Sequence, residues 1–241
     1  EVPIDQATSF GVIAVEDNNR IVGFEEKPRQ PKAIPGRPDM AFASMGVYLF
    51  DTKKILEHLR FDALQDTSHD FGKNIIPEMM MTSRVCAYNF IDKNKKAAKY
   101  WRDVGTIDAY WEANRDLVSV DPLLNLYDAA WPMRTYQAQN PPAKFVFAQE
   151  KKGGRLGTAL DSIIAHGCIL SGGRVQNSVL SPNVRVNSYT EVLDSILMEN
   201  VDVGRHCKIR RAIIDKDVVV PPGTEIGYNS DEDRKRFHVT P

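Results

Sequence analysis

The last third of the chain carries a repeat of 16 to 17 residues. A small residue followed by two aliphatic residues begins each unit, at Ser162, Ser178, Ser195 and Ala212. Between these points an aliphatic side chain recurs about every six residues, with Gly or Asn at corners such as Gly167. Three such steps make one coil of a parallel β-helix, whose sequence signature is the hexapeptide repeat. The repeat therefore predicts a β-solenoid of about four coils.

A series of β-hairpins is the alternative explanation of this period. Hairpins would show strict alternation of apolar and polar residues and characteristic two-residue turns. Neither pattern is evident in residues 158–241. The β-helix is therefore the favoured interpretation.

The first half of the chain mixes strand-like and helix-like patterns. Strands are predicted at residues 10–16, 20–26, 41–50 and 84–90. Helices are predicted at residues 52–60 and 70–80, and a third after a Thr106 cap, with Thr52 capping the first. The first two strands read as a hairpin around Asp17, Asn18 and Asn19. This order indicates an α/β layer.

Prolines and glycines interrupt residues 119–157, which therefore read as an ordered connector. The expected organisation is an α/β domain at 1–118, this connector, and a β-helix at 158–241.

The composition excludes several classes of protein. With 31 Lys and Arg against 32 Asp and Glu, the net charge of −1 provides no basic excess for binding nucleic acid. A hydrophobic share of 42% suits a packed core. The three cysteines lack metal or redox spacing, and no apolar run is long enough for a membrane helix. A cytoplasmic protein without a nucleic-acid or membrane partner is expected.

Four short clusters carry groups suited to a phosphorylated ligand. Pro28 ends a strand and would expose Lys27 as a point charge for a phosphate, although a solvated strand end is the simpler interpretation. Ser44 lies in a strand close to Gly46, where a ligand can approach closely. Asp70 either caps a helix or binds a ligand. Asp103, which follows Trp101, could ligate Mg²⁺ while the ring packs on a sugar.

Taken together and in order, these clusters resemble the bacterial ADP-glucose pyrophosphorylases, also called glucose-1-phosphate adenylyltransferases. The blocks that carry the resemblance are EKP at 26–28, ASMG at 43–46, SHDFG at 68–72, YWRDVGT at 100–106, WPMRTY at 131–136 and PPAKF at 141–145. Sugar nucleotidyltransferases in general share the EKP and WxDxGT-like elements. The SHDFG, WPMRTY and PPAKF blocks are typical of the adenylyl branch.

The resemblance implies the C-terminal part of a Rossmann-like nucleotidyltransferase domain followed by a left-handed parallel β-helix. It implies transfer of AMP from ATP to glucose 1-phosphate, giving ADP-glucose and pyrophosphate for glycogen synthesis, with Mg²⁺ as cofactor. The implied catalytic residues are Lys27 and Asp103, the latter as metal ligand. The implied substrate-binding residues are Glu26, Lys27, Ser44, Tyr48, Asp70, Phe71 and Trp101.

One departure from the family pattern concerns the nucleotide. A Gly-rich GGxGxRL loop, which holds the triphosphate in the family, is absent from the sequence. Residues 153–157, GGRLG, lie in the connector and receive no phosphate role. The chain is therefore expected to be the C-terminal portion of a longer protein, without the ATP half of the site and inactive alone.

The resemblance also implies a homotetramer regulated by sugar-phosphate or carboxylate effectors. Basic residues of the last coils could attract such anions, and Lys216 is the candidate allosteric residue; the others are Arg205, Lys208, Arg210 and Arg211. Three alternatives stay open: a nucleotidylyltransferase using UTP or dTTP, a non-catalytic regulatory paralogue, and a hexapeptide acyltransferase. The last would need His166 or His206 as a catalytic group, whereas solvated corner histidines are the simpler interpretation.

Overall fold

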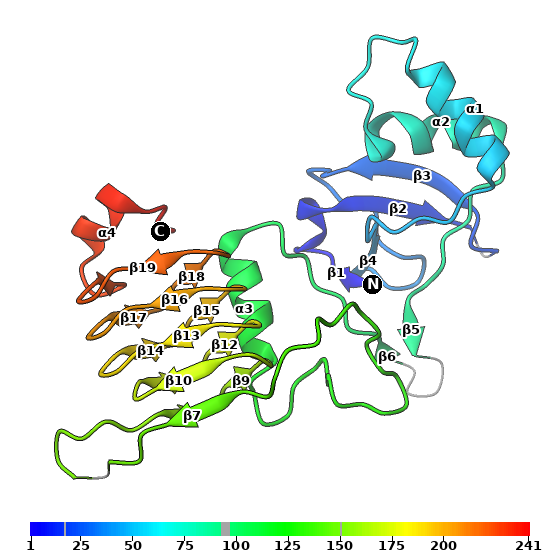
Figure 1. Cartoon of the computed structure of the whole chain (residues 1–241). Helices are drawn as coiled ribbons and strands as arrows, with labels where there is room; N and C mark the ends of the chain where they lie inside the picture. Colours follow the sequence, from blue (N-terminus) through cyan, green and yellow to red (C-terminus); the bar gives the residue numbers. More distant parts are fainter. Residues whose placement is uncertain (17, 93–96, 150) are drawn as a thin grey trace. The chain divides into compact units, whose positions relative to one another are not determined.

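The computed structural model describes residues 1–241 except residues 17, 93–96 and 150. These residues form two compact units, 1–101 and 102–241 (Figure 1). The division falls between Trp101 and Arg102, whereas the sequence pattern suggests a boundary at residue 118. None of the described helices has the length and apolar character needed to cross a bilayer.

The first unit is built on a four-stranded sheet. Its strands, in spatial order, are β1 (Val2–Pro3), β4 (Met40–Ala43), β2 (Gly11–Val15) and β3 (Ile21–Glu26). β2 is antiparallel to both β3 and β4, so the predicted hairpin is confirmed. Asn19 adopts the left-handed conformation that the turn requires, with φ at 62°, while Asp17 lies outside the described residues.

Two predicted strands differ from the structure. β4 ends at Ala43 rather than near Phe50, and Gly46 turns the chain with φ at 69°. Val47 and Leu49 beyond this turn are 77% and 101% exposed, so apolar character there does not reflect a buried strand. The strand predicted at residues 84–90 is reduced to a single antiparallel bridge between Cys86 and Arg20.

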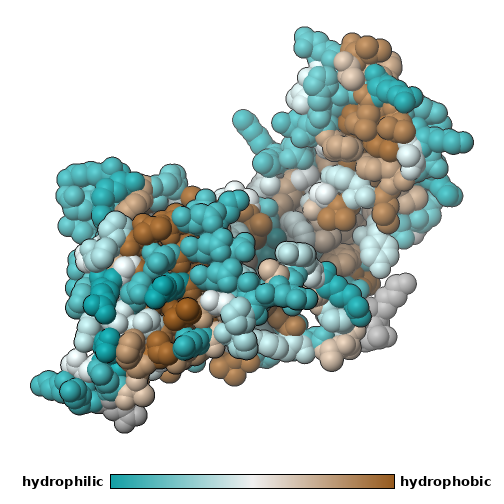
Figure 2. All heavy atoms as spheres, viewed as in Figure 1, coloured by the Kyte–Doolittle hydropathy of each residue, from teal (hydrophilic) through white to brown (hydrophobic). Residues whose placement is uncertain are grey.

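Helical segments follow the sheet: α1 (Thr52–Asp62), a π-helical turn η2 (Phe71–Ile75) and α2 (Ile76–Thr82). η2 and α2 pack against β3, and α1 packs against η2. A short 3₁₀ turn η1 (Ala7–Ser9) precedes β2, and β5 (Ile91–Asp92) pairs with β6 (Ala97–Ala98). The cap of α1 is Asp51 rather than the predicted Thr52, because its carboxylate accepts the free N–H groups of Lys53 and Lys54. Apolar side chains remain on the surface around α1 and α2 (Figure 2), and the exposed ones include Leu56 of α1 and Met81 of α2.

The second unit is a parallel β-solenoid, as the repeat predicts. One sheet comprises β7 (Lys144–Val146), β10 (Ile169–Ser171), β13 (Arg185–Val186), β16 (Asp202–Val203) and β19 (Val219–Val220). The second comprises β8 (Thr158–Leu160), β11 (Arg174–Gln176), β14 (Glu191–Leu193), β17 (Lys208–Arg210) and β20 (Glu225–Ile226). The third comprises β9 (Ile163–Ile164), β12 (Val179–Leu180), β15 (Ile196–Leu197) and β18 (Ile213–Ile214). β7 lies within the segment that reads as a connector, and α4 (Ser230–Arg236) follows the last coil.

Left-handed residues at the corners keep the coils in register. One corner stacks Gly167, Asn183, Asn200 and Asp217, all with positive φ. Asn183 donates to Asn200, and Asn200 donates to Asp217, over 3.2 and 2.9 Å between the side-chain atoms. Asn and Asp tolerate this conformation and bond across the coils, which explains the polar residues that punctuate the repeat.

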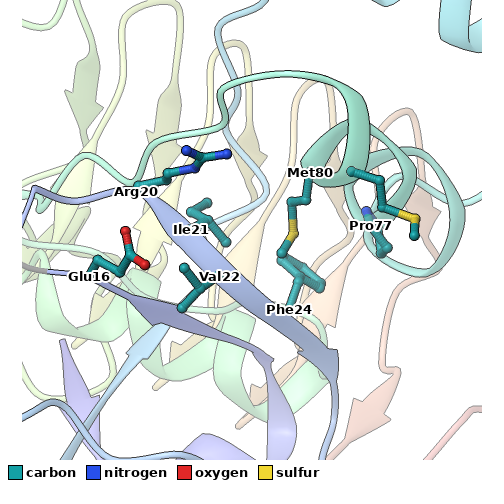
Figure 3. Close-up of a pocket in the computed structure, with 8 residues that line it drawn as sticks. Glu16, Arg20, Ile21, Val22, Phe24, Pro77 and Met80 are labelled. Atoms are coloured by element: carbon teal, nitrogen blue, oxygen red, sulfur yellow. The ribbon is translucent and has the colours of Figure 1, made fainter.

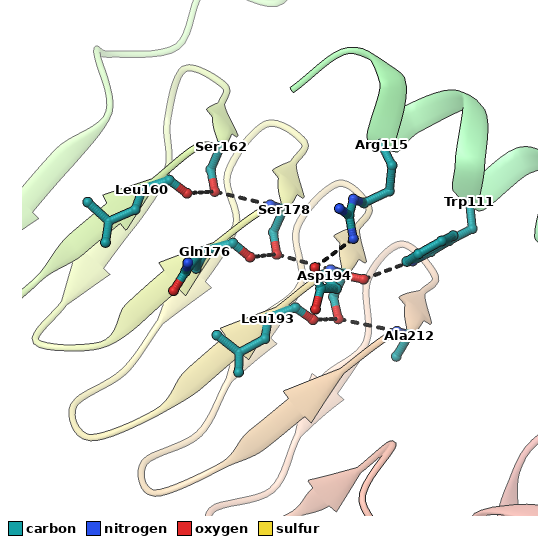
Figure 4. A network of polar contacts seen from close by, with 10 residues as sticks. Trp111, Arg115, Leu160, Ser162, Gln176, Ser178, Leu193, Asp194 and Ala212 are labelled. Carbon is teal, nitrogen blue, oxygen red and sulfur yellow. Dashed lines mark hydrogen bonds and ion pairs between the residues drawn. The ribbon is translucent and has the colours of Figure 1, made fainter. Parts of the chain in front are cut away.

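The small residue of each repeat also has a structural role. The hydroxyl groups of Ser162, Ser178 and Ser195 each donate to a backbone carbonyl of their own coil. Each also accepts the backbone N–H of the equivalent residue in the next coil, and the last of these donors belongs to Ala212 (Figure 4). Buried backbone groups at this corner are thereby paired.

The two aliphatic residues of each repeat point in opposite directions, because side chains alternate along a strand. Leu180, Leu197 and Ile214 belong to the solenoid core. Ile196 lies outside that core cluster, yet it is only 2% exposed. Helix α3 (Ile107–Asp116) lies on this side of the solenoid (Figure 4), where two of its side chains bond Asp194, which lies between β14 and β15.

Candidate functional site

One edge of the first unit's sheet brings together residues that are far apart in the sequence. Because β3 and β4 both run antiparallel to β2, they end beside the start of β2, where Glu26 pairs with Gly11 and Ala43 pairs with Val12. Gly11 pairs with Glu26 across one side, and its carbonyl accepts the backbone N–H of Ser44 on the other side at 2.7 Å. Glu26 and Ser44 therefore flank one glycine.

The Glu26 carboxylate occupies a space that two glycines leave open. A Cβ atom on Gly11 would lie 2.9 Å from Glu26 Oε2, and one on Gly72 would lie 3.2 Å from the same oxygen. The latter Cβ would also lie 3.3 Å from Asp70 Oδ1, so two carboxylates converge on Gly72. Larger residues at positions 11 and 72 would displace these acidic groups.

Aromatic rings adjoin the same place. Tyr48 Oη lies 3.0 Å from Ser44 Oγ, and the Tyr48 ring stacks on Phe71 with 6.0 Å between the ring centroids. The Phe50 ring lies beside both, with 5.9 Å between its centroid and the centroid of each of these rings. Tyr48 and Phe71 are 36% and 38% exposed, so ring surface remains open to a ligand. Exposed ring faces beside hydroxyl and carboxylate groups suit the apolar faces and hydroxyls of a sugar.

Lys27 and Trp101 are linked through Phe10. The Lys27 backbone N–H donates to the Phe10 carbonyl, and Lys27 holds the left-handed conformation with φ at 48°. The Trp101 ring meets the Phe10 ring edge to face, with 5.4 Å between centroids. The exposed Lys27 ammonium makes no ion pair with any residue that the structure describes, so its charge is available to an anion.

Asp70 is held by its own helix and by the preceding residue. Its carboxylate accepts the Lys73 N–H at 2.8 Å, so the capping role holds. His69, whose φ is 54°, bonds the carboxylate of Asp62. Hydrogen bonds from His69 and then Thr67 lower the pKa of Asp62, which keeps this carboxylate ionised. The loop before η2 is therefore anchored to the end of α1.

Asp103 belongs to the second unit, in the loop that precedes α3. Asp103 Oδ1 accepts the Gly105 N–H at 3.2 Å, and the side chain is exposed. A Cβ on Gly105 would lie 3.2 and 3.3 Å from the two carboxylate oxygens, so only glycine leaves them uncrowded. Such an open carboxylate fits Mg²⁺, which usually takes one or two carboxylates and completes its shell with phosphate oxygens and water. The described residues contain no group of three or more potential ligands.

A hollow of about 400 Å³ lies between β3 and α2 (Figure 3). Its lining includes Arg20, Val22, Phe24 and Met80. None of the expected substrate residues lines it, although Phe24 also touches the position where a Gly72 side chain would begin. The hollow is thus adjacent to the candidate site without being part of it.

The residues expected to attract effectors occupy different settings in the last coils. Lys208 bonds Glu225 at 2.8 Å, and this contact raises the pKa of Lys208. Arg210 and Arg211 lie over the rings of Tyr228 and Trp111, respectively. Lys216 is exposed and its backbone N–H bonds Asp215.

The two solenoid histidines, His166 and His206, each contact a neighbouring side chain of the protein. His206 has a left-handed φ of 57° and stacks on Tyr189 at 4.9 Å between centroids, and a ring nitrogen of His166 lies 3.0 Å from Asn140.

The residues that organise the site are not among those that the sequence motifs predict. Gly11 and Gly72 admit the carboxylates, Phe10 joins Lys27 to Trp101, and Asp62 anchors His69. Gly72 stands in the SHDFG block, where a glycine directly after a ligand candidate is a usable signal. The role of Asp62 depends on a contact between residues seven positions apart on two elements, for which the sequence offers no signal.

Known families match both parts of the chain. The nucleotidyl transferase family matches residues 1–120, and the GlmU-like C-terminal hexapeptide family matches residues 141–241.

Curated relatives match nearly the whole chain. A glucose-1-phosphate adenylyltransferase of Koribacter versatilis is 56% identical over 96% of the chain and 55% of its own length. Those of Rhodopirellula baltica and Methylococcus capsulatus are 54% and 51% identical, over 96% and 100% of the chain and 52% and 56% of their own lengths. The chain thus spans about half the length of these relatives. With these matches across both units, the chain belongs to the glucose-1-phosphate adenylyltransferase family.

Proposed function

We propose that this chain forms the sugar-phosphate half of an enzyme that transfers AMP from ATP to glucose 1-phosphate. The observation that supports it most is the convergence at one sheet edge of Glu26, Lys27, Ser44, Tyr48, Asp70, Phe71 and Trp101. These are the substrate residues that the family resemblance implies, and contacts within one unit join them.

Each group has a distinct task in this proposal. The Lys27 ammonium binds the phosphate of glucose 1-phosphate, and the carboxylates of Glu26 and Asp70 accept hydrogen bonds from sugar hydroxyls. The rings of Tyr48 and Phe71 pack on the sugar. A phosphate oxygen then attacks the α-phosphorus of ATP in line, and pyrophosphate leaves. Catalysis is mainly positioning and neutralisation of charge.

Asp103 is the proposed ligand for Mg²⁺. A bound Mg²⁺ would neutralise charge on the phosphates during the transfer. The ATP-binding groups are proposed to lie in the part of the longer relatives that this chain does not match. The choice of ATP over UTP or dTTP would depend on that part.

The remaining expectations are proposals of the same kind. They are a role in glycogen synthesis, a left-handed solenoid, a homotetramer, and regulation through Lys216 by sugar-phosphate or carboxylate effectors. The family relationship supports each of them.

The test is Mg²⁺-dependent release of pyrophosphate from ATP and glucose 1-phosphate by the full-length protein. We expect release that requires both substrates and the metal. Activity with UTP or dTTP alone would favour another nucleotidylyltransferase. Binding of glucose 1-phosphate without turnover would favour a regulatory paralogue, and acyl transfer from a CoA thioester would favour the acyltransferase.

A further inference from the structure

Two arginines connect the Asp103 loop to the solenoid through α3. The Arg102 guanidinium contacts two carboxylates one turn apart on this helix: Nη1 donates to Asp116 Oδ2 at 2.6 Å, and Nη2 donates to Glu112. Arg115, on the same helix, donates from Nη1 to Asp194 Oδ1 at 2.6 Å. Both arginine side chains are 30% exposed, so each pair is partly shielded from solvent.

The Asp103 loop is closed at both of its ends. Arg102 folds back onto the last turns of α3, while the Thr106 hydroxyl caps the first turn by accepting the Ala109 N–H at 3.1 Å. The short segment between them, which carries Asp103, is therefore tied to the helix. Any displacement of α3 would move the carboxylate.

The helix is in turn fixed to one corner of the solenoid. Asp194 has a left-handed φ of 49°, and its carbonyl accepts the Trp111 indole N–H at 2.8 Å while its carboxylate binds Arg115 (Figure 4). The Arg115 guanidinium also lies over the Trp111 ring, 5.0 Å from its centroid. One residue of the third coil thus holds α3 through two separate bonds.

We infer that Arg102 and Arg115 are positioning residues, through which the solenoid sets the location of the Asp103 carboxylate. The inference rests on the proposed function, in which Asp103 binds Mg²⁺. The proposed sugar contacts belong to the compact unit of residues 1–101, and the proposed metal carboxylate belongs to the unit of residues 102–241. A change at Asp194 in the solenoid corner would therefore affect the Mg²⁺ requirement more than the binding of glucose 1-phosphate.

The experiment uses the full-length protein and the variants Arg115→Gln and Asp194→Asn. We expect hydrogen exchange in residues 103–106 to become about 10-fold faster, because the loop opens more often when its anchor is lost. We also expect turnover to fall about 10-fold and the half-saturating Mg²⁺ concentration to rise, with the KM for glucose 1-phosphate within about twofold of the original.

The charge-swapped double variant, Arg115→Asp with Asp194→Arg, tests the pair itself. Arg211 occupies the equivalent corner of the next coil with φ at 50°, so an arginine can adopt this conformation at position 194. We expect the swap to restore slow exchange and metal affinity. Arg236→Gln is the matched control, because Arg236 bonds Asp233 at 3.0 Å in α4 and makes no hydrogen bond or ion pair with α3 among the described residues.

Unchanged exchange and unchanged Mg²⁺ dependence in Arg115→Gln would overturn the inference, as would equal effects of Arg236→Gln. A swap that folds but restores neither quantity would also overturn it. If the unaltered protein releases no pyrophosphate, the proposed function fails, while the exchange measurement still decides whether the solenoid holds the loop.

Discussion

His69 Nδ1 lies 2.7 Å from Asp62 Oδ2 and joins the last residue of α1 to the loop before η2. Asp62 is only 6% exposed, and Thr67 donates a second hydrogen bond to its other oxygen at 2.8 Å. Asp70 and Phe71 follow His69 directly, so this buried carboxylate orients the loop that carries two proposed sugar contacts.

The Asp62 contact predicts a specific pH dependence of stability. Because the folded-state pKa of Asp62 lies below its ordinary value, its contribution is complete above that ordinary value and is lost as the pH falls toward the lowered one. Asp62→Asn should therefore unfold at a lower temperature at neutral pH, and the difference from the original protein should shrink as the pH falls through this window. Thermal unfolding followed by circular dichroism at several pH values measures this. A constant difference at every pH would contradict the assignment.

Lys27→Ala should weaken the binding of glucose 1-phosphate far more than the binding of ATP. Loss of a charge-assisted hydrogen bond costs about 1.5–3 kcal/mol, so the KM for glucose 1-phosphate should rise roughly 10- to 150-fold. Steady-state kinetics of the full-length protein with each substrate varied in turn measures the two constants. Lys32→Ala is a control, because Lys32 is an exposed lysine that pairs with Glu25 at 3.4 Å. Equal increases for both substrates would remove Lys27 from the phosphate site.

Asp103→Asn should lower turnover and raise the Mg²⁺ requirement while the fold stays intact. The amide is similar in size and can still accept the Gly105 N–H, but it is a poorer ligand for a hard cation. A loss of roughly 100-fold or more is expected if the metal supplies several kcal/mol. Metal titration of the activity, with circular dichroism as a check of folding, tests this. Unaltered turnover would exclude the metal role.

The serine ladder predicts unequal costs for equivalent substitutions. Ser195 is fully buried, and its hydroxyl pairs the Leu193 carbonyl and the Ala212 N–H. Ser195→Ala should therefore lower the free energy of unfolding by about 1–3 kcal/mol. The Ala212 N–H loses its partner, and the Leu193 carbonyl, which also accepts the Arg211 N–H, loses one of its two donors. Ser162→Ala should cost less, since water reaches this end of the ladder. Denaturant titration of both variants measures the difference, and equal losses would show that the hydroxyl bonds do not stabilise the corner.

Lys216→Glu tests the proposed regulation. We expect the full-length protein to sediment as a tetramer activated by a glycolytic intermediate, and we expect this exposed charge reversal to weaken activation at least about tenfold. Turnover without effector should not change. A monomer in sedimentation, or activation of the variant equal to that of the original protein, would contradict this proposal.

The repeat made the solenoid predictable, and the motif blocks pointed to residues that the structure places near one another at one sheet edge. One repeat unit of 16 to 17 residues cannot bury its aliphatic side chain by itself, so the units must stack as successive coils. Ser178, Leu180 and their equivalents in the other coils therefore indicate a solenoid directly. The hairpin through Asn19 and the helix after Thr106 were likewise local patterns with local causes.

Other features depended on contacts that sequence patterns do not report. The apolar stretch after Ala43 reads as strand, but a strand needs a partner, and β4 finds one only as far as Ala43. The close approach of Glu26 and Asp70 follows from two glycines on separate elements. Most clearly, Asp103 reads as a neighbour of Trp101, yet α3 ties it to Asp194, more than 90 positions away. Local propensity and periodicity depend on neighbouring residues in the sequence. The partner of a side chain is determined only when the chain packs, because burial and charge pairing act through space.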